Sequence, residues 1–480
     1  MIKLLSFSTI RFQKLDYYVG IDIIKQYLVN KGYPTTTDNF TLSLYPPDDG
    51  AKFVVKKPIL YDNFDKAIPE IYQLQPIIQL IKNYQNNNDL LKDISKYFTD
   101  FEMDNIKNLI EYTNNYKIKD GDIVGLQVIY RFVFHCLLFV LQLKKSNPNK
   151  KITTVFGGYH ITESKVVREF LLKFDFIDYI VIDDGRQPML DIVKGNTKSK
   201  ELKGSFVGLT YPEYIKLDRI IRKDKDFQIT TTVGCPNHCR FCASHRHHIL
   251  YDIEYIKRYL IRQHKIYPIK NITFVDDLIN PTKERLKEIC KMLLELQSKH
   301  NMKFGWEAHC YALNIDNELA DLMNKTNCKS VFLGTEIFDD KILTIINKGC
   351  LSSDYKNTIL KLTKKNIKTK LGIIVNLPEE TREIFLSSLE KLKEINNENV
   401  IIIPSLFKLF PNCHIYRHPE NYGIKIINWD QDIVDSLTEI KGMAIPKEWY
   451  YINDPSSTGK NRMNLILKYL KETESGDTYS

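Results

Sequence analysis

Strand-sized and helix-sized hydrophobic segments alternate along most of the 480 residues, and this alternation restricts the fold more than any other feature. Short apolar runs predict strands, and most of them precede a longer segment with the spacing of an amphipathic helix. Repeated strand–helix units form parallel sheets that carry helices on their faces. We therefore predict an α/β protein, and the alternation restarts once, at about Phe227, which indicates two such units.

Residues 1–200 predict a Rossmann-like, doubly wound domain. Its strands are expected at 2–8, 122–129, 152–156 and 179–182, and its helices at about 17–30, 132–145, 164–172 and after Pro188. The polar, asparagine-rich residues 34–120 interrupt the pattern, and we interpret them as an inserted helical subdomain. Ligands of such sheets bind beyond the carboxyl ends of the strands.

Residues 220–425 predict a second unit with six strands in succession. They are expected at 228–232, 271–275, 303–308, 329–333, 369–375 and 399–403. Barrels built from strand–helix units place their chemistry at the carboxyl ends of the strands. The remaining residues, 426–480, are interpreted as a small C-terminal cap with a polar end.

Three cysteines stand within eight residues at the end of the first strand of the second unit. Cys235, Cys239 and Cys242 lie in the segment GCPNHCRFC, with the spacing C-x3-C-x2-C. Three thiolates can bind three irons of a [4Fe–4S] cluster and leave the fourth iron open to a small molecule. The alternatives are a zinc knuckle, for which nearby histidines lack the usual ordered spacing, or three buried thiols.

This cysteine pattern, with Phe241 before the last cysteine, resembles the signature of the radical S-adenosylmethionine (SAM) enzymes. The resemblance implies a partial (β/α)6 TIM-type barrel, with the cluster on the three cysteines and SAM at its open iron. It assigns SAM contacts to Phe241, Asp276, Asp277, Glu336 and Asn376. The aspartates and Glu336 could instead cap helices. Asn376 replaces a glycine of the family's G-x-I-x-G-x-x-E stretch, and asparagine tolerates a positive φ.

The order of segments in residues 1–200 resembles the cobalamin-binding domain that precedes many radical SAM barrels. Residues 157–160 match its GG-x-H turn, whereas 183–186 carry Asp and Arg where glutamates are usual. The resemblance implies cobalamin contacts from Gln127, Gly157, Gly158, Tyr159, His160, Asp184 and Gly185. The D-x-H-x-x-G motif, which donates a histidine to cobalt, is absent. The alternative is a Rossmann-like domain with another ligand or none.

The resemblance implies an enzyme that cleaves SAM to a 5′-deoxyadenosyl radical, which abstracts hydrogen from the substrate. Cobalamin-dependent methylation of an unactivated carbon is the first hypothesis. The second is a radical oxidation, rearrangement, crosslink or epimerisation without methyl transfer, and the third is a non-enzymatic iron–sulfur electron carrier or sensor. The expected substrate is a peptide or a small natural product, and the expected electron donor is of the flavodoxin or ferredoxin type.

Composition limits the cellular compartment and the classes of partner that we expect for this chain. The net charge is +9, but lysines are scattered and form no basic stripe, so we expect no nucleic-acid partner. The most apolar segment, residues 132–143, is too short to span a membrane. Nine cysteines without a disulfide-like spacing indicate a reducing compartment, and we expect the cytoplasm.

Overall fold

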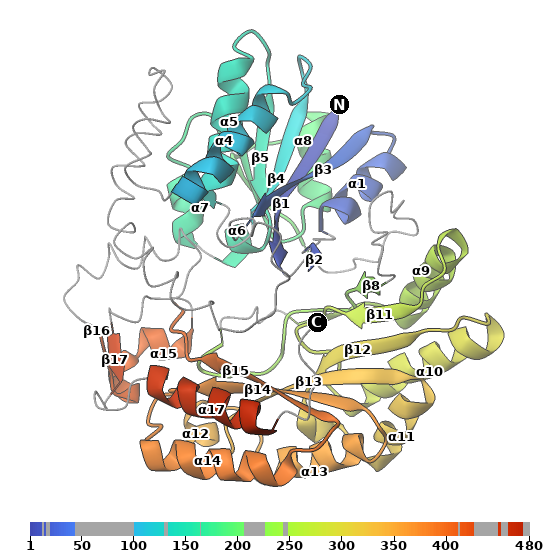
Figure 1. Cartoon of the computed structure of the whole chain (residues 1–480). Helices are drawn as coiled ribbons and strands as arrows, with labels where there is room; N and C mark the ends of the chain where they lie inside the picture. The colour runs from blue at the N-terminus through green and yellow to red at the C-terminus, as the bar shows by residue number, and fades with distance from the viewer. Residues whose placement is uncertain are drawn as a thin grey trace. The chain divides into compact units, whose positions relative to one another are not determined.

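The computed structural model divides into two compact units (Figure 1). The residues that it describes are 1–11, 14–15, 20–43, 100–128, 133–163, 165–205, 226–242, 248–410, 413–426, 450–452 and 459–473. Those up to residue 205 belong to the first unit and those from residue 226 onwards to the second. Each unit contains one large sheet, and each is described by itself below.

The sheet of the first unit is parallel apart from a short hairpin strand. Its strands are β1 (Ile2–Arg11), β3 (Thr35–Ser43), β4 (Ile123–Gln127), β5 (Thr153–Gly157), β6 (Tyr179–Ile182) and β7 (Glu201–Lys203), with β2 (Lys14–Leu15) antiparallel to the end of β1. The parallel order is β3-β1-β4-β5-β6-β7. The first five strands follow the flavodoxin-like order, which has its ligand-binding switch point between β1 and β4.

Helices cover both faces of this sheet. They are α1 (Gly20–Asn30), α4 (Asp100–Asn114), α5 (Val133–Ser146), α6 (Tyr159–Glu163), α7 (Lys165–Leu171) and α8 (Arg186–Lys194). A core of Leu4, Val155 and Val181 from the strands meets Leu28 of α1 and Met189 of α8. Figure 1 shows α4, α5 and α7 on the other side from α1, and α4 packs against α5. The predicted doubly wound domain is confirmed.

The boundaries of the predicted insert, 34–120, were wrong. β3 pairs with β1 along its whole length, and α4 packs against α5 and β3, so both ends of this range belong to the sheet domain. Residues 44–99 lie outside the described residues. The sequence hid β3 because its segment, TTTDNFTLS, is polar, although Thr35 and Thr37 are buried. Threonine is β-branched and suits a half-buried strand at the side of a sheet.

The second unit has six parallel strands in sequential order. They are β8 (Asp226–Ile229), β11 (Asn271–Phe274), β12 (Gly305–Cys310), β13 (Cys328–Glu336), β14 (Lys368–Val375) and β15 (Val400–Leu406). β8 and β15 stand at the two ends of the order, so the described strands form an open sheet, not a closed barrel. The predicted partial barrel is confirmed.

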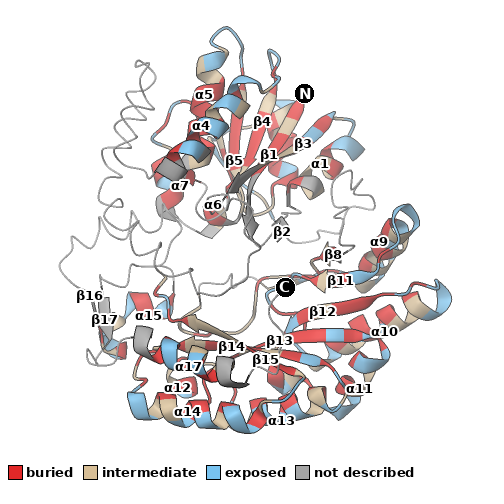
Figure 2. Cartoon of the chain, viewed as in Figure 1, coloured by how far each residue is buried: buried red, intermediate tan, exposed pale blue. Residues whose placement is uncertain are grey.

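The helices of the second unit cover the outer face of its sheet (Figure 1). They include α9 (Ile253–Ile266), α10 (Lys283–Lys299), α11 (Asn317–Lys325), α12 (Asp340–Ile345), α13 (Ser352–Thr363) and α14 (Arg382–Ile395). Figure 2 shows the strands largely buried and the outward sides of these helices exposed. Trp306 of β12 represents the core: it is 1% exposed, and its indole N–H donates to Thr326 Oγ1 at 3.0 Å.

The described part of the tail is built into this unit. The long helix α17 (Gly459–Thr473) packs against β14, β15 and α14 and buries Met463, Ile466 and Tyr469. The short strands β16 (Ile424–Ile426) and β17 (Tyr450–Ile452) pair with each other. The tail was expected to contain a helix, and α17 is that helix; its apolar side packs against the barrel.

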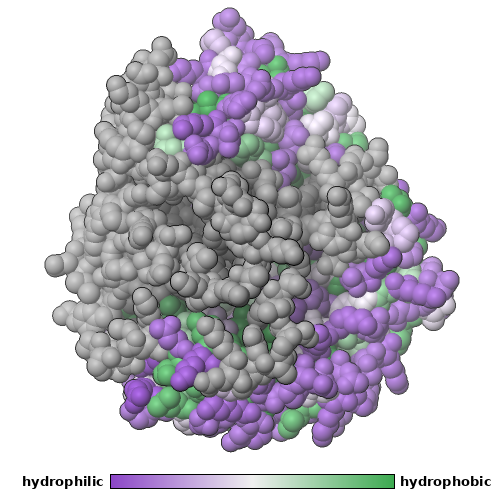
Figure 3. Space-filling view, in the orientation of Figure 1, coloured by the Kyte–Doolittle hydropathy of each residue, from purple (hydrophilic) through white to green (hydrophobic). Residues whose placement is uncertain are grey.

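The visible surface of the described helices is mostly hydrophilic, with scattered apolar residues (Figure 3). Among the described helices, none combines the length and the apolarity that a membrane crossing requires.

Candidate functional site

The cysteine loop begins where β8 ends, at the carboxyl edge of the second sheet. After β8 the chain forms β9 (Thr232–Val233), which pairs with β10 (Ile249–Leu250), and it then turns at Gly234 with φ +73°. Cys239 is buried, whereas Cys235 and Cys242 are partly exposed. This is the strand end at which the sequence places the three cysteines, and it is the edge where barrels of this kind carry their chemistry.

The end of helix α12 holds the cysteine loop in place. Arg240 donates its backbone N–H to Ile346 O at 2.8 Å and its guanidinium to Ile345 O at 2.9 Å. Asn347 Nδ2 donates to His238 O at 2.9 Å. These bonds satisfy carbonyl groups that a helix end leaves without partners. They also fix the loop to a packed helix, so the three thiols do not depend on the loop alone for their position.

Asp276 supports the loop from the side of β8. Its carboxylate accepts hydrogen bonds from Thr231 N at 2.5 Å, Thr232 N at 2.8 Å and Thr231 Oγ1 at 2.6 Å, and the residue is 2% exposed. Burial raises the pKa of this carboxyl to about 6, although these hydrogen bonds work in the opposite direction. Both oxygens thus anchor the backbone that precedes the cysteines. The expected contact of Asp276 with SAM stays a prediction.

The neighbouring Asp277 is exposed and lies close enough to Cys235 to act on it electrostatically. The two adjacent aspartates therefore have different surroundings. Asp276 anchors the backbone before the loop, and Asp277 is the exposed carboxylate at this strand end.

Glu336 lies at the end of β13 in the left-handed region, with φ +60°, and is 7% exposed. Its carboxylate forms an ion pair with Lys348 Nζ at 2.6 Å. Lys348 follows α12 and lies over the ring of Phe241, with its Nζ 5.7 Å from the ring centroid. The structure thus brings together Glu336, Phe241 and the cysteine loop, as predicted. The sequence analysis missed Lys348, whose only signal was the Asn-Lys-Gly turn after a helix.

The thiols lie in the electrostatic reach of this ion pair. Burial raises the pKa of Cys239 to about 11, and Lys348 works against that rise. Burial also opposes a charge on Lys348, but Glu336 and the cysteines outweigh it and raise the pKa of the ammonium. Metal binding requires thiolates, so a fixed cation beside them favours the form that binds iron.

Asn376 ends β14 in the left-handed region, with φ +69°, which confirms that asparagine can replace the glycine of the family pattern. Arg462 of α17 donates from Nη1 to Asn376 Oδ1 at 2.9 Å and lies 3.5 Å from Glu380 Oε1. Glu380 Oε2 in turn accepts from Leu377 N at 2.8 Å. Burial raises the pKa of Glu380 to about 7. Arg462 could not be identified from the sequence because 86 positions separate it from Asn376.

A cluster of polar side chains lies on the sheet face that points away from the helices. Glu307 of β12 binds Lys370 of β14 at 2.8 Å, Ser330 of β13 at 2.8 Å and Thr273 of β11 at 3.3 Å. Its neighbours Trp306 and Ala308 are buried on the helix side, which places Glu307 on the inner face. The inner face of the partial barrel therefore carries a charged and hydroxyl-rich layer that the sequence analysis did not identify.

The candidate cobalamin residues meet at the carboxyl edge of the first sheet. Gln127 ends β4, and Gly157 ends the adjacent β5; Val128 N donates to Gly157 O at 2.7 Å, and His160 N donates to Val128 O at 3.4 Å. Gly158 has φ +107°, and a Cβ there would lie 2.8 Å from Val128 O. Only glycine fits this crossing. His160 is buried, and the side chain of Tyr159 lies outside the described residues.

The turn after β6 departs from the expected pattern in structure as well as in sequence. The Asp184 carboxylate accepts from Arg186 N at 2.9 Å and from Arg186 Nε at 3.0 Å. Gly185 packs against Ile24 of α1, because a Cβ at Gly185 would lie 2.7 Å from Ile24 Cδ1. Gly185 and Asp184 lie at the predicted edge, but Asp184 is bound to Arg186.

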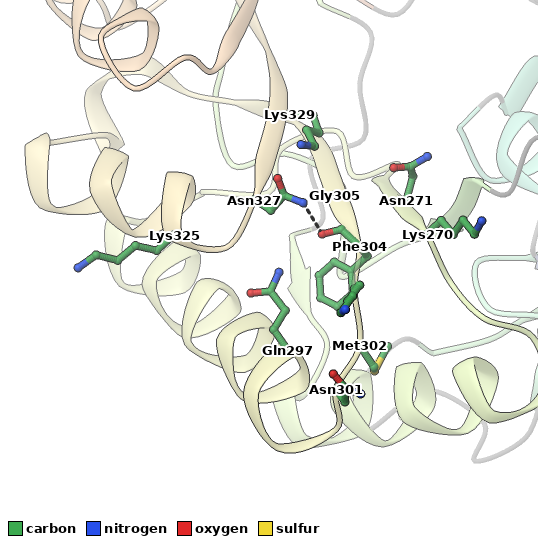
Figure 4. A pocket seen from close by; sticks show the side chains of 11 residues that line it. Lys270, Asn271, Gln297, Asn301, Met302, Phe304, Gly305, Lys325, Asn327 and Lys329 are labelled. Atoms are coloured by element: carbon green, nitrogen blue, oxygen red, sulfur yellow. Dashed lines mark hydrogen bonds between the residues drawn. The ribbon is translucent and has the colours of Figure 1, made fainter.

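A cavity of about 530 Å³ lies at the opposite edge of the second sheet, where β11, β12 and β13 begin (Figure 4). Its lining includes Lys270, Lys303, Lys325 and Lys329. Lysines near the C-terminal ends of α10 and α11 offset the negative ends of these helices. The cavity is remote from the cysteine loop, and we assign it no part in the site.

Among the described residues, no three His, Cys, Asp or Glu side chains converge as the ligands of one metal ion do. The cysteines of an iron–sulfur cluster bind different irons, so they need not meet at one point.

The comparison with family models identifies a domain in the second unit, and relatives match larger parts of the chain. Residues 229–392 match the model of the Radical SAM superfamily. An uncharacterized methyltransferase of Pyrococcus horikoshii, PH0819, is 24% identical over 357 residues, which are 67% of this chain and 75% of the relative. The anaerobic magnesium-protoporphyrin IX monomethyl ester cyclase of Rubrivivax gelatinosus is 26% identical over 315 residues, which are 57% of this chain and 54% of the relative.

Two solved structures resemble the chain over both units. The radical SAM methyltransferase TsrM of Kitasatospora setae, with cobalamin and a [4Fe–4S] cluster bound, matches with a TM-score of 0.59 and 13% identity, over 89% of this chain and 81% of TsrM. The cobalamin-dependent radical SAM enzyme OxsB matches with a TM-score of 0.53 and 12% identity, over 98% of this chain and 61% of OxsB. Residues 229–392 are thus a radical SAM domain, and the chain as a whole shares the fold of TsrM and OxsB.

Proposed function

We propose that this protein is a cobalamin-dependent radical SAM enzyme that methylates an unactivated carbon of its substrate. The observation that carries the proposal is the cysteine loop, which presents three thiols at the carboxyl edge of a six-stranded partial barrel. The chemistry supplied by the bound groups is SAM cleavage to a 5′-deoxyadenosyl radical, hydrogen abstraction, and methyl transfer from cobalamin. The chain's own contribution is to hold these groups and to exclude competing reactions.

The residues of the second unit fit a cluster and SAM. Cys235, Cys239 and Cys242 supply three thiolate ligands, and the α12 contacts fix the loop that carries them. The left-handed turn at Asn376 presents backbone groups at the next part of the edge, where the family pattern places the adenine. Phe241 and the Glu336–Lys348 pair lie beside the thiols and leave an aromatic and a charged surface for the sulfonium cofactor.

The first unit fits a ligand at the carboxyl edge of its sheet, where β4 and β5 end. Gln127 Oε1 is buried and has no hydrogen-bond partner within the described residues, which is costly unless a ligand or water satisfies it. Gly157 and Gly158 present bare backbone beside it. A cofactor with amide and phosphate groups, as cobalamin has, would satisfy both features.

Methyl transfer is favoured by the relatives, since PH0819 is described as a methyltransferase and TsrM as a radical SAM methyltransferase. A radical oxidation, rearrangement, crosslink or epimerisation is the second candidate. The Asp184–Arg186 pair favours it, because a carboxylate bound to its own helix is withdrawn from the turn where the cobalamin pattern expects an acidic residue.

The partners follow from the same chemistry. We propose a peptide or small polar natural product as substrate, because the inner face near Glu307 and Lys370 is charged. One electron per SAM cleavage would come from a flavodoxin- or ferredoxin-type donor. Within the described part of the chain the nine cysteines form no disulfide, which fits a reducing compartment, and we propose the cytoplasm.

An anaerobic experiment tests the proposal. The full chain, produced with cobalamin, is reconstituted with iron and sulfide, and its visible and electron paramagnetic resonance spectra are recorded. SAM and a reductant are then added, and 5′-deoxyadenosine and S-adenosylhomocysteine are quantified. The expected results are a [4Fe–4S] signal, a retained corrinoid, and both products. A chain that forms no cluster would overturn the whole proposal; a cluster and 5′-deoxyadenosine without corrinoid would leave the second candidate.

A further inference from the structure

Lys348 is not among the residues that the family pattern assigns to the site, yet several contacts fix its position. It stands two residues after Ile346, the C-cap of α12. Asn347, between them, has φ +53°. Asn347 N donates to Thr344 O at 3.0 Å, and Lys348 N donates to Leu343 O at 2.9 Å. This pair of bonds is the Schellman motif, with Asn347 as its left-handed residue. The motif ends α12 and turns Lys348 back toward the cysteine loop.

The same helix end is bonded to the loop that carries the thiols. Ile345 and Ile346 accept from Arg240, and Asn347 donates to His238, in the two residues that flank Cys239. The residue that carries the ammonium and the residues that carry the sulfurs therefore belong to one hydrogen-bonded assembly. Their separation does not depend on a flexible surface loop.

The end of the Lys348 side chain has room because residue 334 is a glycine. A Cβ at Gly334 would lie 3.0 Å from Lys348 Nζ and 2.6 Å from Glu336 Oε1, so a larger residue there would displace the pair. The carbonyl of Lys348 accepts from Tyr311 Oη at 3.3 Å. The side chains of Lys348 and Glu336 are only 11% and 10% exposed.

A purely structural role would explain the ion pair between Lys348 and Glu336. It would not explain why the ammonium lies beside the cysteine loop. Taking two charges out of water is costly, and a buried pair is weak evidence for stability by itself. Here the ammonium lies on the side of the pair that adjoins the cysteine loop. The ring of Phe241, which precedes Cys242, lies within cation–π range of the same ammonium.

We propose that Lys348 is a positioning residue of the redox site, whose fixed ammonium raises the reduction potential of the cluster bound by Cys235, Cys239 and Cys242, while Glu336 moderates this effect. The inference rests on the proposed function. The step concerned is the gain of one electron by the cluster from an external one-electron donor, and no bond forms or breaks. A nearby positive charge stabilises the reduced cluster, which carries one more negative charge.

The test is a potentiometric titration of the reconstituted full chain, without SAM, monitored by electron paramagnetic resonance. Lys348→Met is expected to shift the reduction equilibrium about tenfold toward the oxidised cluster, which for one electron is about 59 mV. Lys348→Arg keeps the charge and should restore most of the potential. Glu336→Gln removes the moderating charge and should shift the potential in the opposite direction. Lys341→Met, an exposed lysine on the same helix, is the matched control and should not move it.

Each result decides the proposal. An intact cluster with an unchanged potential in Lys348→Met overturns it, and so does an equal shift in Lys341→Met, since that would indicate a general charge effect. If Lys348→Met assembles no cluster, Glu336→Gln decides the question. A cluster potential that does not rise in Glu336→Gln overturns the proposal. Failure of the wild-type chain to assemble any cluster is a different outcome, because it contradicts the proposed function itself.

Discussion

The two parallel sheets use their carboxyl edges in different ways. The edge of the first sheet is built from backbone: Gly158 lies against Val128, just beyond β4, where a side chain has no room, and Gly185 packs directly on α1. The edge of the second sheet is built from side chains, with three thiols, the Glu336–Lys348 pair and Asp277. Backbone edges suit the holding of a large preformed cofactor, whereas charged edges suit the control of a reaction.

The strongest test of this contrast removes one side chain from the second edge. Cys239→Ala should abolish both the cluster and the formation of 5′-deoxyadenosine, because two remaining thiolates cannot hold three irons. Iron content, the visible spectrum and product analysis measure the effect. Cys290→Ala, which removes a buried thiol from α10, is the control and should retain the cluster. A normal cluster in the Cys239 variant would show that the side chains of this edge are not what binds it.

A single methyl group should be enough to damage the first edge. Gly158→Ala places a Cβ against Val128 O and forces a left-handed φ, so we expect corrinoid retention to fall several-fold while the cluster of the second unit persists. The strain costs about 1–3 kcal/mol. Corrinoid absorbance per chain is the measurement.

Gly121→Ala is the matched control for that variant. Gly121 also has a left-handed φ, +78°, but nothing lies within 4 Å of its Cβ position. It should lose stability without losing corrinoid. Equal corrinoid loss in both variants would mean that general destabilisation, not the crossing at Val128, is responsible.

Arg462 sharpens the contrast between the two sheet edges, because its side chain supports the backbone turn at Asn376 in the second sheet. Arg462→Met leaves Asn376 Oδ1 and Glu380 without their guanidinium contact, so we expect SAM affinity to fall about tenfold, or 1.4 kcal/mol. Cluster content and potential should not change. Calorimetric titration with SAM measures this, and Asn464→Ala, an exposed change on the same helix, should bind SAM normally.

Glu380 gives the smallest expected effect, on the pH dependence of stability. Its pKa is raised by burial from 4.5 to about 7, so the folded chain binds more protons than the unfolded chain between these values. The contribution of this group to the free energy of unfolding is therefore fully present below about pH 4.5 and is lost as the pH rises through about 7. Denaturant titrations at several pH values should show a shallower decline for Glu380→Gln. Identical slopes would contradict the assignment.

Features that depend on local pattern were predictable from the sequence. The six strands of the partial barrel and the cysteine loop at its first strand end followed from alternation and from spacing. The left-handed turn at Asn376 followed from the tolerance of asparagine for positive φ. The doubly wound first sheet was predicted in type, but β3 was missed because its residues are polar.

Features that depend on packing were not predictable. Asp276 and Asp277 are adjacent and chemically identical, and only the fold decides that one binds Thr231 and Thr232 while the other is exposed. Lys348 had a local signal in the Asn-Lys-Gly turn, but nothing in the sequence joins it to Glu336. Arg462 had no local signal, because its partners lie far back in the chain.

The position of Arg462 near the end of the sequence has a consequence for biosynthesis. A nascent chain that has just completed Asn376 and Glu380 must wait for 86 further residues after Asn376 before the guanidinium that neutralises this turn has been made. Until then, a growing barrel would hold a carboxyl group that cannot be buried as an anion. Cofactor loading at this edge should therefore follow the docking of α17, so chains interrupted before that helix are expected to be poor acceptors of SAM even when all six strands are present.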